Sequence, residues 1–214
     1  MSSAAERRAR EALAAADPVM AGLIERLGER SVIQRRRGAP KPDAYGALLR
    51  TVVGQQISTA AARTIYGRVL DIFGGRTPSP RQLLETSEDD LRAAGLSRPK
   101  VGYIRDLAAH VESGELEIDR LDELSDEEVI EEIVAVRGFG RWSAEMFLIF
   151  HLERPDVISG GDLGIRRAIQ IGLGMAEMPT PAEVAEIGER WSPYRSLASI
   201  YLWESLSKLP ADAD

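Results

Sequence analysis

Asp162 is the residue of this chain whose type and position could support chemistry. It follows Ser159-Gly160-Gly161 and precedes the helix-forming run 163–168. A carboxylate can stabilise positive charge that develops in a transition state, and it can orient or deprotonate a water molecule. An aspartate at such a position is also a common helix N-cap, and the sequence alone favours that structural role.

The turn Arg137-Gly138-Phe139-Gly140 is a second place where a ligand could bind. Its two glycines permit backbone angles that a side chain would forbid. A helix that begins directly after such a turn presents free backbone N–H groups and the positive end of its dipole, which suits a phosphate oxygen. The alternative is an ordinary connection between two helices.

Apolar periodicity and capping residues predict the elements that position these groups. Ser125 and Glu128 have the spacing of a capping box, so they are expected to open a helix before the turn. A well-buried second helix, 142–150, is expected after it. The apolar face of the first helix is predicted to comprise Val129, Ile130, Ile133, Val134 and Val136.

The rest of the chain also has helical period, so the fold class is predicted to be all-α, without strands. At 214 residues we expect a single domain over 1–214, or two lobes that share one core. Residues 35–42 form a basic loop, which is either a solvated connector or a phosphate contact. The remaining predicted helices span residues 4–15, 17–29, 43–56, 58–73, 80–86, 87–94, 97–113, 180–190 and 193–208.

Composition limits the cofactors and the location. The chain has no cysteine, which excludes disulfides, thiolate zinc sites and iron–sulfur clusters. Neither His110 nor His151 has a metal-ligand partner at the third or fourth position after it. No apolar run approaches the ~20 residues that span a bilayer, and the first residues do not resemble a signal peptide. We expect a cytoplasmic protein, or a nuclear one in a eukaryote.

The charge balance argues against a protein that coats DNA. The formal net charge is −7, from 27 basic and 34 acidic residues, whereas non-specific DNA affinity comes from basic side chains. An enzyme with a small basic footprint remains compatible. The acidic residues cluster in 115–132, so we expect an uneven field around the basic residues Arg137, Arg141, Arg166 and Arg167.

Two segments, VRGFGRWSAEMFLIF at 136–150 and GDLGIRRA at 161–168, resemble the helix-hairpin-helix DNA glycosylases. More narrowly, they are similar to the 3-methyladenine DNA glycosylase II, or alkyl-base, branch. Support comes from VVGQQISTAA at 52–61, GLSRPKVGYIRDLA at 95–108 and WSPYRSLASIYLW at 191–203. The resemblance implies two helical lobes that flank a cleft, both termini in one lobe, a hairpin over about 125–152 and no additional N-terminal β domain.

The resemblance implies that Asp162 is the catalytic carboxylate. Cleavage of an N-glycosidic bond gives C1′ carbocation character, which a nearby carboxylate stabilises. A base alkylated at N3 or N7 is already cationic and leaves without a second acid. The family often has proline before this aspartate, so Ser159-Gly160-Gly161 predicts a more mobile loop.

The resemblance also implies a pocket for a flipped base, lined by Trp142, Met146, Leu163 and Trp203. Bifunctional relatives have a lysine in place of Trp142, and its amine attacks C1′. An indole has no such amine, so we expect a monofunctional enzyme that leaves the strand intact. The alternative for Trp142 and Trp203 is core packing, and we assign Trp191 to the core.

Contacts with DNA are predicted for two loops. Gly138, Phe139, Gly140 and Arg141 are expected to bind the DNA backbone, as in the family. At the turn between helices, Gln55, Gln56 and Ile57 are expected to fill the gap that a flipped nucleotide leaves, with Gln56 as the best candidate.

No cofactor is predicted, except that hairpin carbonyls hold a monovalent cation, Na⁺ or K⁺, in the family. Carried over, the carbonyls belong to Val134, Val136 and Phe139.

The predicted function is excision of alkylated purines from damaged double-stranded DNA in base excision repair, by base flipping and hydrolysis. We expect a monomer that does not bind membranes. Two alternatives remain: a non-catalytic helix-hairpin-helix module that binds DNA structures, and a glycosylase for neutral deaminated bases.

Overall fold

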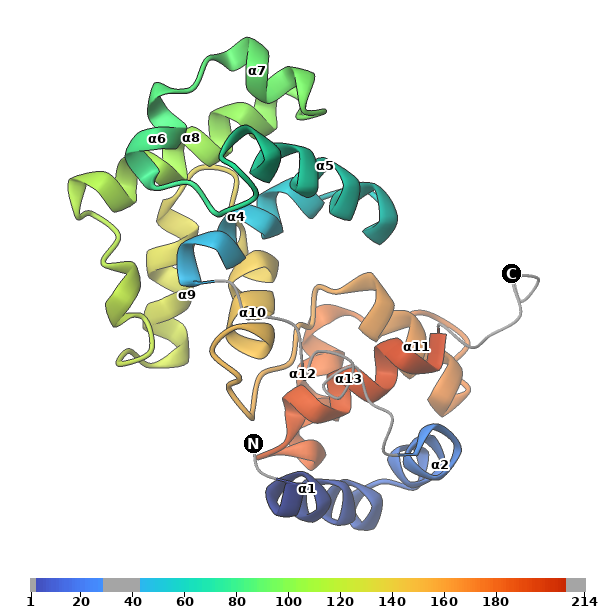
Figure 1. The fold of residues 1–214 in the computed structure, drawn as a ribbon. Coiled ribbons are helices and arrows are strands. Elements are labelled where there is room, and N and C mark those ends of the chain that lie inside the picture. The colour runs from blue at the N-terminus through green and yellow to red at the C-terminus, as the bar shows by residue number, and fades with distance from the viewer. Residues whose placement is uncertain (1–2, 29–42, 207–214) are drawn as a thin grey trace. The chain divides into compact units, whose positions relative to one another are not determined.

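The computed structural model describes residues 3–28 and 43–206, and within them every regular element is a helix, which confirms the all-α prediction (Figure 1). The α-helices are α1 (Ser3–Ala16), α2 (Pro18–Leu27), α4 (Ala44–Gly54), α5 (Thr59–Ile72), α6 (Pro80–Glu85), α7 (Glu88–Ala93), α8 (Arg98–Ser113), α9 (Asp126–Ala135), α10 (Arg141–Phe150), α11 (Leu163–Leu173), α12 (Pro181–Gly188) and α13 (Arg195–Leu206). Two short 3₁₀ helices, η1 (Ile118–Arg120) and η2 (Glu189–Trp191), were not predicted.

The chain folds into two compact units. The discontinuous unit comprises Met1–Pro40 and Glu153–Asp214, and the continuous unit comprises Lys41–Leu152. Both ends of the chain therefore belong to the same unit, in agreement with the arrangement that the resemblance implied. The basic loop 35–42 lies outside the described residues.

The discontinuous unit is built around α13. Consecutive residues from Ser196 to Leu202 are all buried, so this helix is surrounded on every side. It packs against α2 and α11, and the side chains of α1 and η2 complete the apolar core. Trp191 is buried in this core, as predicted, and its indole Nε1 donates to Asp17 Oδ2 at 2.9 Å. Asp17 in turn caps α2 by accepting from Val19 N at 2.8 Å.

The continuous unit is built around α4, which contacts α5, α8 and α10. Leu48, Leu49, Val52 and Val53 of α4 are fully buried, at the spacing of one broad helix face. The predicted connection to α5 is confirmed, because Ser58 caps α5 by accepting from Ala61 N at 3.3 Å.

The predicted apolar face of α9 was too wide. The capping box of Ser125 and Glu128 forms as expected, and Val129, Ile130 and Ile133 are buried. Val134 instead is 42% exposed. Val134 directly follows Ile133, so its side chain points to a different side of α9. It also lies next to Ala135, where the helix ends, and it falls outside the face that packs.

Candidate active site and DNA-binding hairpin

Asp162 caps α11 and is held by an aromatic side chain from α13. Its Oδ1 accepts from Ile165 N at 2.8 Å, which confirms the predicted N-cap. The same Oδ1 accepts from Trp203 Nε1, also at 2.8 Å. The two bonds hold Oδ1 between the first turn of α11 and the indole of α13.

The discontinuous unit contains a second aspartate with the same kinds of partner. Asp17 also caps a helix and also accepts from an indole, that of Trp191. It is 1% exposed, its Oδ1 accepts from Val19 N, and its Oδ2 accepts from Trp191 Nε1 and lies 3.7 Å from Arg190 Nη1. Asp162 is only half-buried, so it is more exposed to solvent than Asp17.

Gly164 allows the approach of Trp203 to Asp162. A Cβ atom on Gly164 would lie 3.1 Å from Trp203 Cδ1 and 3.0 Å from Asp162 Oδ1. Both distances are shorter than ordinary van der Waals contact. Gly164 was not predicted as a site residue, although the order Asp-Leu-Gly contained the signal. Leu163, between them, is 65% exposed at the start of α11.

The loop before Asp162 is closely packed. Ser159 is fully buried, and its carbonyl accepts from Asp162 N at 3.1 Å. A Cβ atom on Gly160 would lie 2.7 Å from the carbonyl oxygen of Pro181, so only glycine fits here. The glycines of Ser159-Gly160-Gly161 predict a mobile loop. At Gly160, however, the lack of a side chain allows close contact with Pro181 at the start of α12.

The hairpin turn lies in the continuous unit, between α9 and α10. Gly138 has φ = 92°, in the left-handed region that favours glycine. Gly140 is the N-cap of α10 and provides no side-chain cap to the helix. A Cβ atom on Gly140 would meet no heavy atom within 4 Å, so the space beside this N-cap residue is open. Phe139 between them is buried and anchors the turn.

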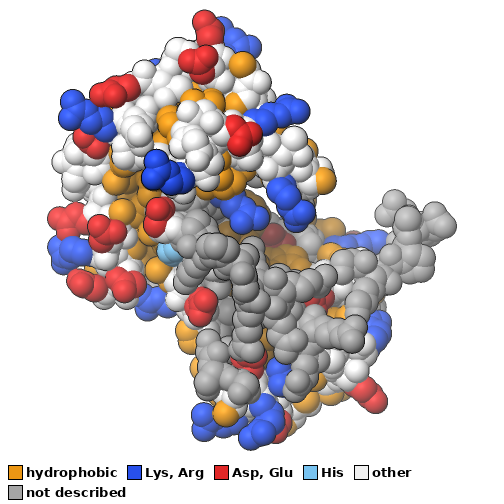
Figure 2. All heavy atoms as spheres, viewed as in Figure 1, with side chains coloured by type: hydrophobic (Ala, Val, Ile, Leu, Met, Phe, Trp, Pro, Cys, Tyr) orange, Lys and Arg blue, Asp and Glu red, His pale blue; other side chains and the backbone are white. Residues whose placement is uncertain are grey.

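Arg141 is already paired with acidic residues. Its two terminal nitrogens donate to Glu127 at 2.8 and 3.0 Å, and its Nε donates to Glu145 at 3.1 Å. The hydrogen bonds from Arg141 hold the pKa of Glu127 below its usual range. The predicted phosphate contact of Arg141 therefore requires exchange of these partners. On the face drawn in Figure 2, acidic and basic side chains are interspersed over the continuous unit.

Trp142 and Met146 are one helical turn apart on α10, so they lie on the same side of the helix. Trp142 is 42% exposed and Met146 is half-buried. The prediction that the whole of 142–150 is well buried was therefore wrong for Trp142. Its exposure argues against the core-packing alternative, because a core tryptophan would be hidden from solvent.

The residues predicted to fill the gap in the base stack, which we call the wedge residues, differ in their contacts. One of them is bonded to the hairpin turn, and the other two are exposed. Gln55 is turned to the hairpin, where its Nε2 donates to Gly138 O at 2.9 Å. Gln56 is exposed and has φ = 57°, a left-handed conformation that is uncommon outside glycine. Ile57 is 36% exposed. Gln56 and Ile57 thus present their side chains to solvent, whereas Gln55 fixes the loop.

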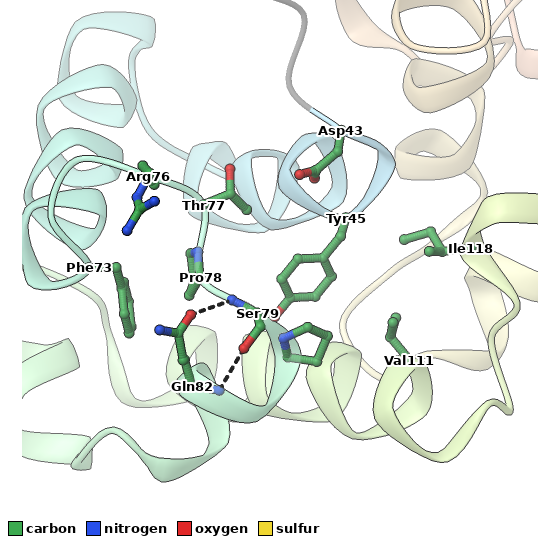
Figure 3. A pocket seen from close by; sticks show the side chains of 11 residues that line it. Asp43, Tyr45, Phe73, Arg76, Thr77, Pro78, Ser79, Gln82, Val111 and Ile118 are labelled. Carbon is green, nitrogen blue, oxygen red and sulfur yellow. Dashed lines mark hydrogen bonds between the residues drawn. The ribbon is translucent and has the colours of Figure 1, made fainter.

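A separate hollow of about 480 Å³ lies in the continuous unit between the start of α4 and the loop 73–80 (Figure 3). Three of its polar side chains already have structural roles. Asp43 caps α4, and Ser79 and Gln82 form the capping box of α6. Tyr45 is buried, which raises the pKa of its hydroxyl. None of the predicted site residues lines this hollow.

The described residues contain no cluster of three or more His, Asp or Glu side chains that could hold a metal ion. His151 stacks on Phe147, with ring centroids 4.7 Å apart, which agrees with a structural role. Among the helices that the structure describes, none combines the length and the apolar character needed to cross a membrane.

Comparison with known proteins agrees with this geometry. The model of the HhH-GPD superfamily of base excision DNA repair proteins matches residues 49–193. The chain therefore belongs to this superfamily of helix-hairpin-helix proteins.

Individual relatives confirm the predicted alkyl-base branch. DNA-3-methyladenine glycosylase 1 of Schizosaccharomyces pombe is 34% identical over 175 residues, which cover 81% of this chain and 76% of that protein. DNA-3-methyladenine glycosylase of Saccharomyces cerevisiae is 41% identical over 199 residues, covering 77% and 67% respectively. The solved structure of a 3-methyladenine DNA glycosylase of S. pombe in complex with abasic DNA has a TM-score of 0.85 and 32% identity, and covers 94% of this chain and 97% of that one.

Proposed function

We propose that this protein is a monofunctional DNA glycosylase that excises alkylated purines in base excision repair. The observation that carries the proposal is Asp162, a partly accessible carboxylate held at the N-terminus of α11 by Ile165 N and Trp203 Nε1. The superfamily and the relatives named for 3-methyladenine support the substrate class. Damaged double-stranded DNA is the partner, in the compartment that contains the chromosome.

The chemistry requires one carboxylate. As the C1′–N bond of a cationic base breaks, the bonding electrons pass to the base, which leaves neutral. Positive charge then develops on C1′ and the ring oxygen, where the Asp162 carboxylate stabilises it. Water adds to C1′ and loses a proton, and the product is an abasic site in an unbroken strand.

The proposed role of the hairpin is to bind the DNA backbone. We propose that the α10 N-terminus binds a DNA phosphate, with Gly140 leaving room for its approach. Trp142 and Met146 are proposed to contact the flipped base, as are Leu163 and Trp203. Gln56, with Ile57, is proposed to fill the gap in the base stack.

We propose that the hairpin carbonyls bind a monovalent cation. Within the described residues, no backbone donor contacts the carbonyl of Val134 or Phe139, and that of Val136 accepts from Phe139 N at 3.1 Å. Carbonyls at a helix end that lack a partner are suited to a cation. We propose that Na⁺ or K⁺ there would add positive charge next to the bound phosphate.

The test is release of 3-methyladenine and 7-methylguanine from methylated duplex DNA, measured by chromatography. We expect release of both bases by the native chain. Binding to damaged duplex without any base release would instead support the non-catalytic module, and release confined to hypoxanthine would support the deaminated-base alternative.

We further expect that borohydride will not trap a covalent complex with DNA. The residue at the lysine position of bifunctional relatives is Trp142, whose indole forms no Schiff base. Gel electrophoresis after the reaction should show strand breakage only after alkali treatment. A trapped adduct would make the enzyme a lyase.

Replacing Trp203 by phenylalanine should slow base release by about tenfold, because it removes a hydrogen bond to a charged group and keeps an aromatic ring. Trp191→Phe is the matched control, since it removes the equivalent bond to Asp17. We expect Trp191→Phe to lower the melting temperature and to leave the single-turnover rate unchanged. Equal rates for the two variants would show that the Trp203–Asp162 bond has no role in the reaction.

A further inference from the structure

One face of α8 contacts both of the loops that are proposed to bind DNA. Lys100, Tyr103 and Asp106, which we call the α8 ridge, are spaced three residues apart and therefore lie along one side of the helix. All three side chains are half-buried. The segment 95–108 was part of the family resemblance, but the proposed chemistry gives these side chains no role.

Lys100 holds the loop 55–58, the proposed wedge. Its Nζ donates to the carbonyl of Val53 at 2.7 Å and to that of Gln55 at 2.8 Å. These carbonyls lie at the C-terminus of α4, where backbone acceptors lack helical partners and a cation is favoured. Because one ammonium group binds two carbonyls, it fixes the direction in which the chain leaves α4.

Asp106 and Tyr103 hold the hairpin turn. Asp106 Oδ2 accepts from the backbone N of Arg137 at 2.8 Å. The ring of Tyr103 occupies the space above Gly138, where a Cβ atom would lie 2.2 Å from its Cγ. The guanidinium of Arg137 lies over the ring of Tyr103, 5.8 Å from its centroid.

Gln55 links the two loops directly. Its backbone carbonyl accepts from Lys100, and its side-chain Nε2 donates to Gly138 O at 2.9 Å. The wedge loop and the turn are therefore connected both through α8 and to each other. These contacts form a closed set within the continuous unit.

We propose that the α8 ridge is a positioning device that fixes the wedge loop in register with the hairpin turn, so that phosphate binding and filling of the base stack occur together. This inference rests on the proposed function. Its physical basis is preorganisation: a loop that is ordered before binding does not lose conformational entropy when DNA binds. Lesion recognition should therefore depend on the ridge more than general DNA affinity does.

The test compares Lys100→Met with Arg98→Met. Both variants lose one positive charge on α8, but the Arg98 side chain is exposed and pairs with Glu88. Affinities for undamaged duplex and for duplex containing an abasic-site analogue are measured by fluorescence anisotropy in 150 mM salt. Flipping is followed with 2-aminopurine next to the lesion, and base release is followed under single-turnover conditions.

For Lys100→Met we expect affinity for undamaged duplex within twofold of Arg98→Met, a preference for the abasic analogue reduced about tenfold and a similarly slower release. Should Lys100→Met fold poorly, Asp106→Ala tests the hairpin end of the ridge with the same expectation. Equal preference and release in the Lys100 and Arg98 variants would overturn the ridge proposal alone. Absence of base release by the native chain would instead overturn the proposed function, whatever the variants show.

Discussion

Replacing Asp162 by asparagine will slow alkyl-base release by at least about 100-fold, the loss typical of removing one preorganised electrostatic group. The amide oxygen still accepts from Ile165 N and Trp203 Nε1, so α11 keeps its cap. What disappears is the negative charge that we propose stabilises C1′ as the base departs. Affinity for duplex containing an abasic analogue should change little.

The control for this variant is Asp17→Asn. Asp17 has the same two kinds of partner as Asp162, a helix N-terminus and an indole, but it is buried in the core. For Asp17→Asn we expect a lower melting temperature and an unchanged single-turnover rate. For Asp162→Asn we expect an unchanged melting temperature and a slower single-turnover rate. If base release survives in Asp162→Asn, the carboxylate is only a cap and the enzymatic proposal loses its central residue.

The two glycines of the hairpin turn should respond differently to alanine. At Gly138 the new methyl group would lie 2.2 Å from Tyr103 Cγ, on a residue with φ = 92°. The left-handed backbone and the overpacked ring together should cost about 2–5 kcal/mol of unfolding free energy. Denaturation in urea would measure this loss, and DNA binding should fall with the disrupted turn.

Gly140→Ala makes the matching change two residues later. Gly140 has φ = −118°, which alanine adopts readily, and its added methyl group meets nothing within 4 Å. Stability should change by no more than about 0.5 kcal/mol. DNA affinity should nevertheless fall, because the methyl group enters the space proposed for the phosphate. An unchanged urea midpoint for Gly138→Ala would contradict the packing described here, and unchanged affinity for Gly140→Ala would contradict the phosphate site.

Local chemistry explains which features could be predicted from the sequence. The caps at Ser58, Ser125 and Asp162 follow from side chains that reach backbone N–H groups three residues away. Helix existence followed from periodicity in the same way. Val134 was assigned wrongly because periodicity does not show where a helix stops relative to its packed face.

Features that depend on distant residues could not be predicted. Trp203 was identified as a site residue by resemblance, but its bond to Asp162 joins positions 41 residues apart. Lys100 reaches carbonyls 45 and 47 residues away, and the ridge spacing on α8 is common among helices that have no such role. Gly160 was predicted to make its loop mobile. Its contact with Pro181 can be recognised only in the tertiary structure, so the sequence did not reveal it.

The division of the chain has a consequence for biosynthesis. Residues 41–152 form a continuous unit, so the ribosome can complete the hairpin and the α8 ridge while later segments are still being made. The unit that contains Asp162 needs both α2, which precedes the continuous unit in the sequence, and α13, which follows it. A nascent chain can thus complete the proposed DNA-binding turn before Trp203 is available to donate its indole N–H to Asp162.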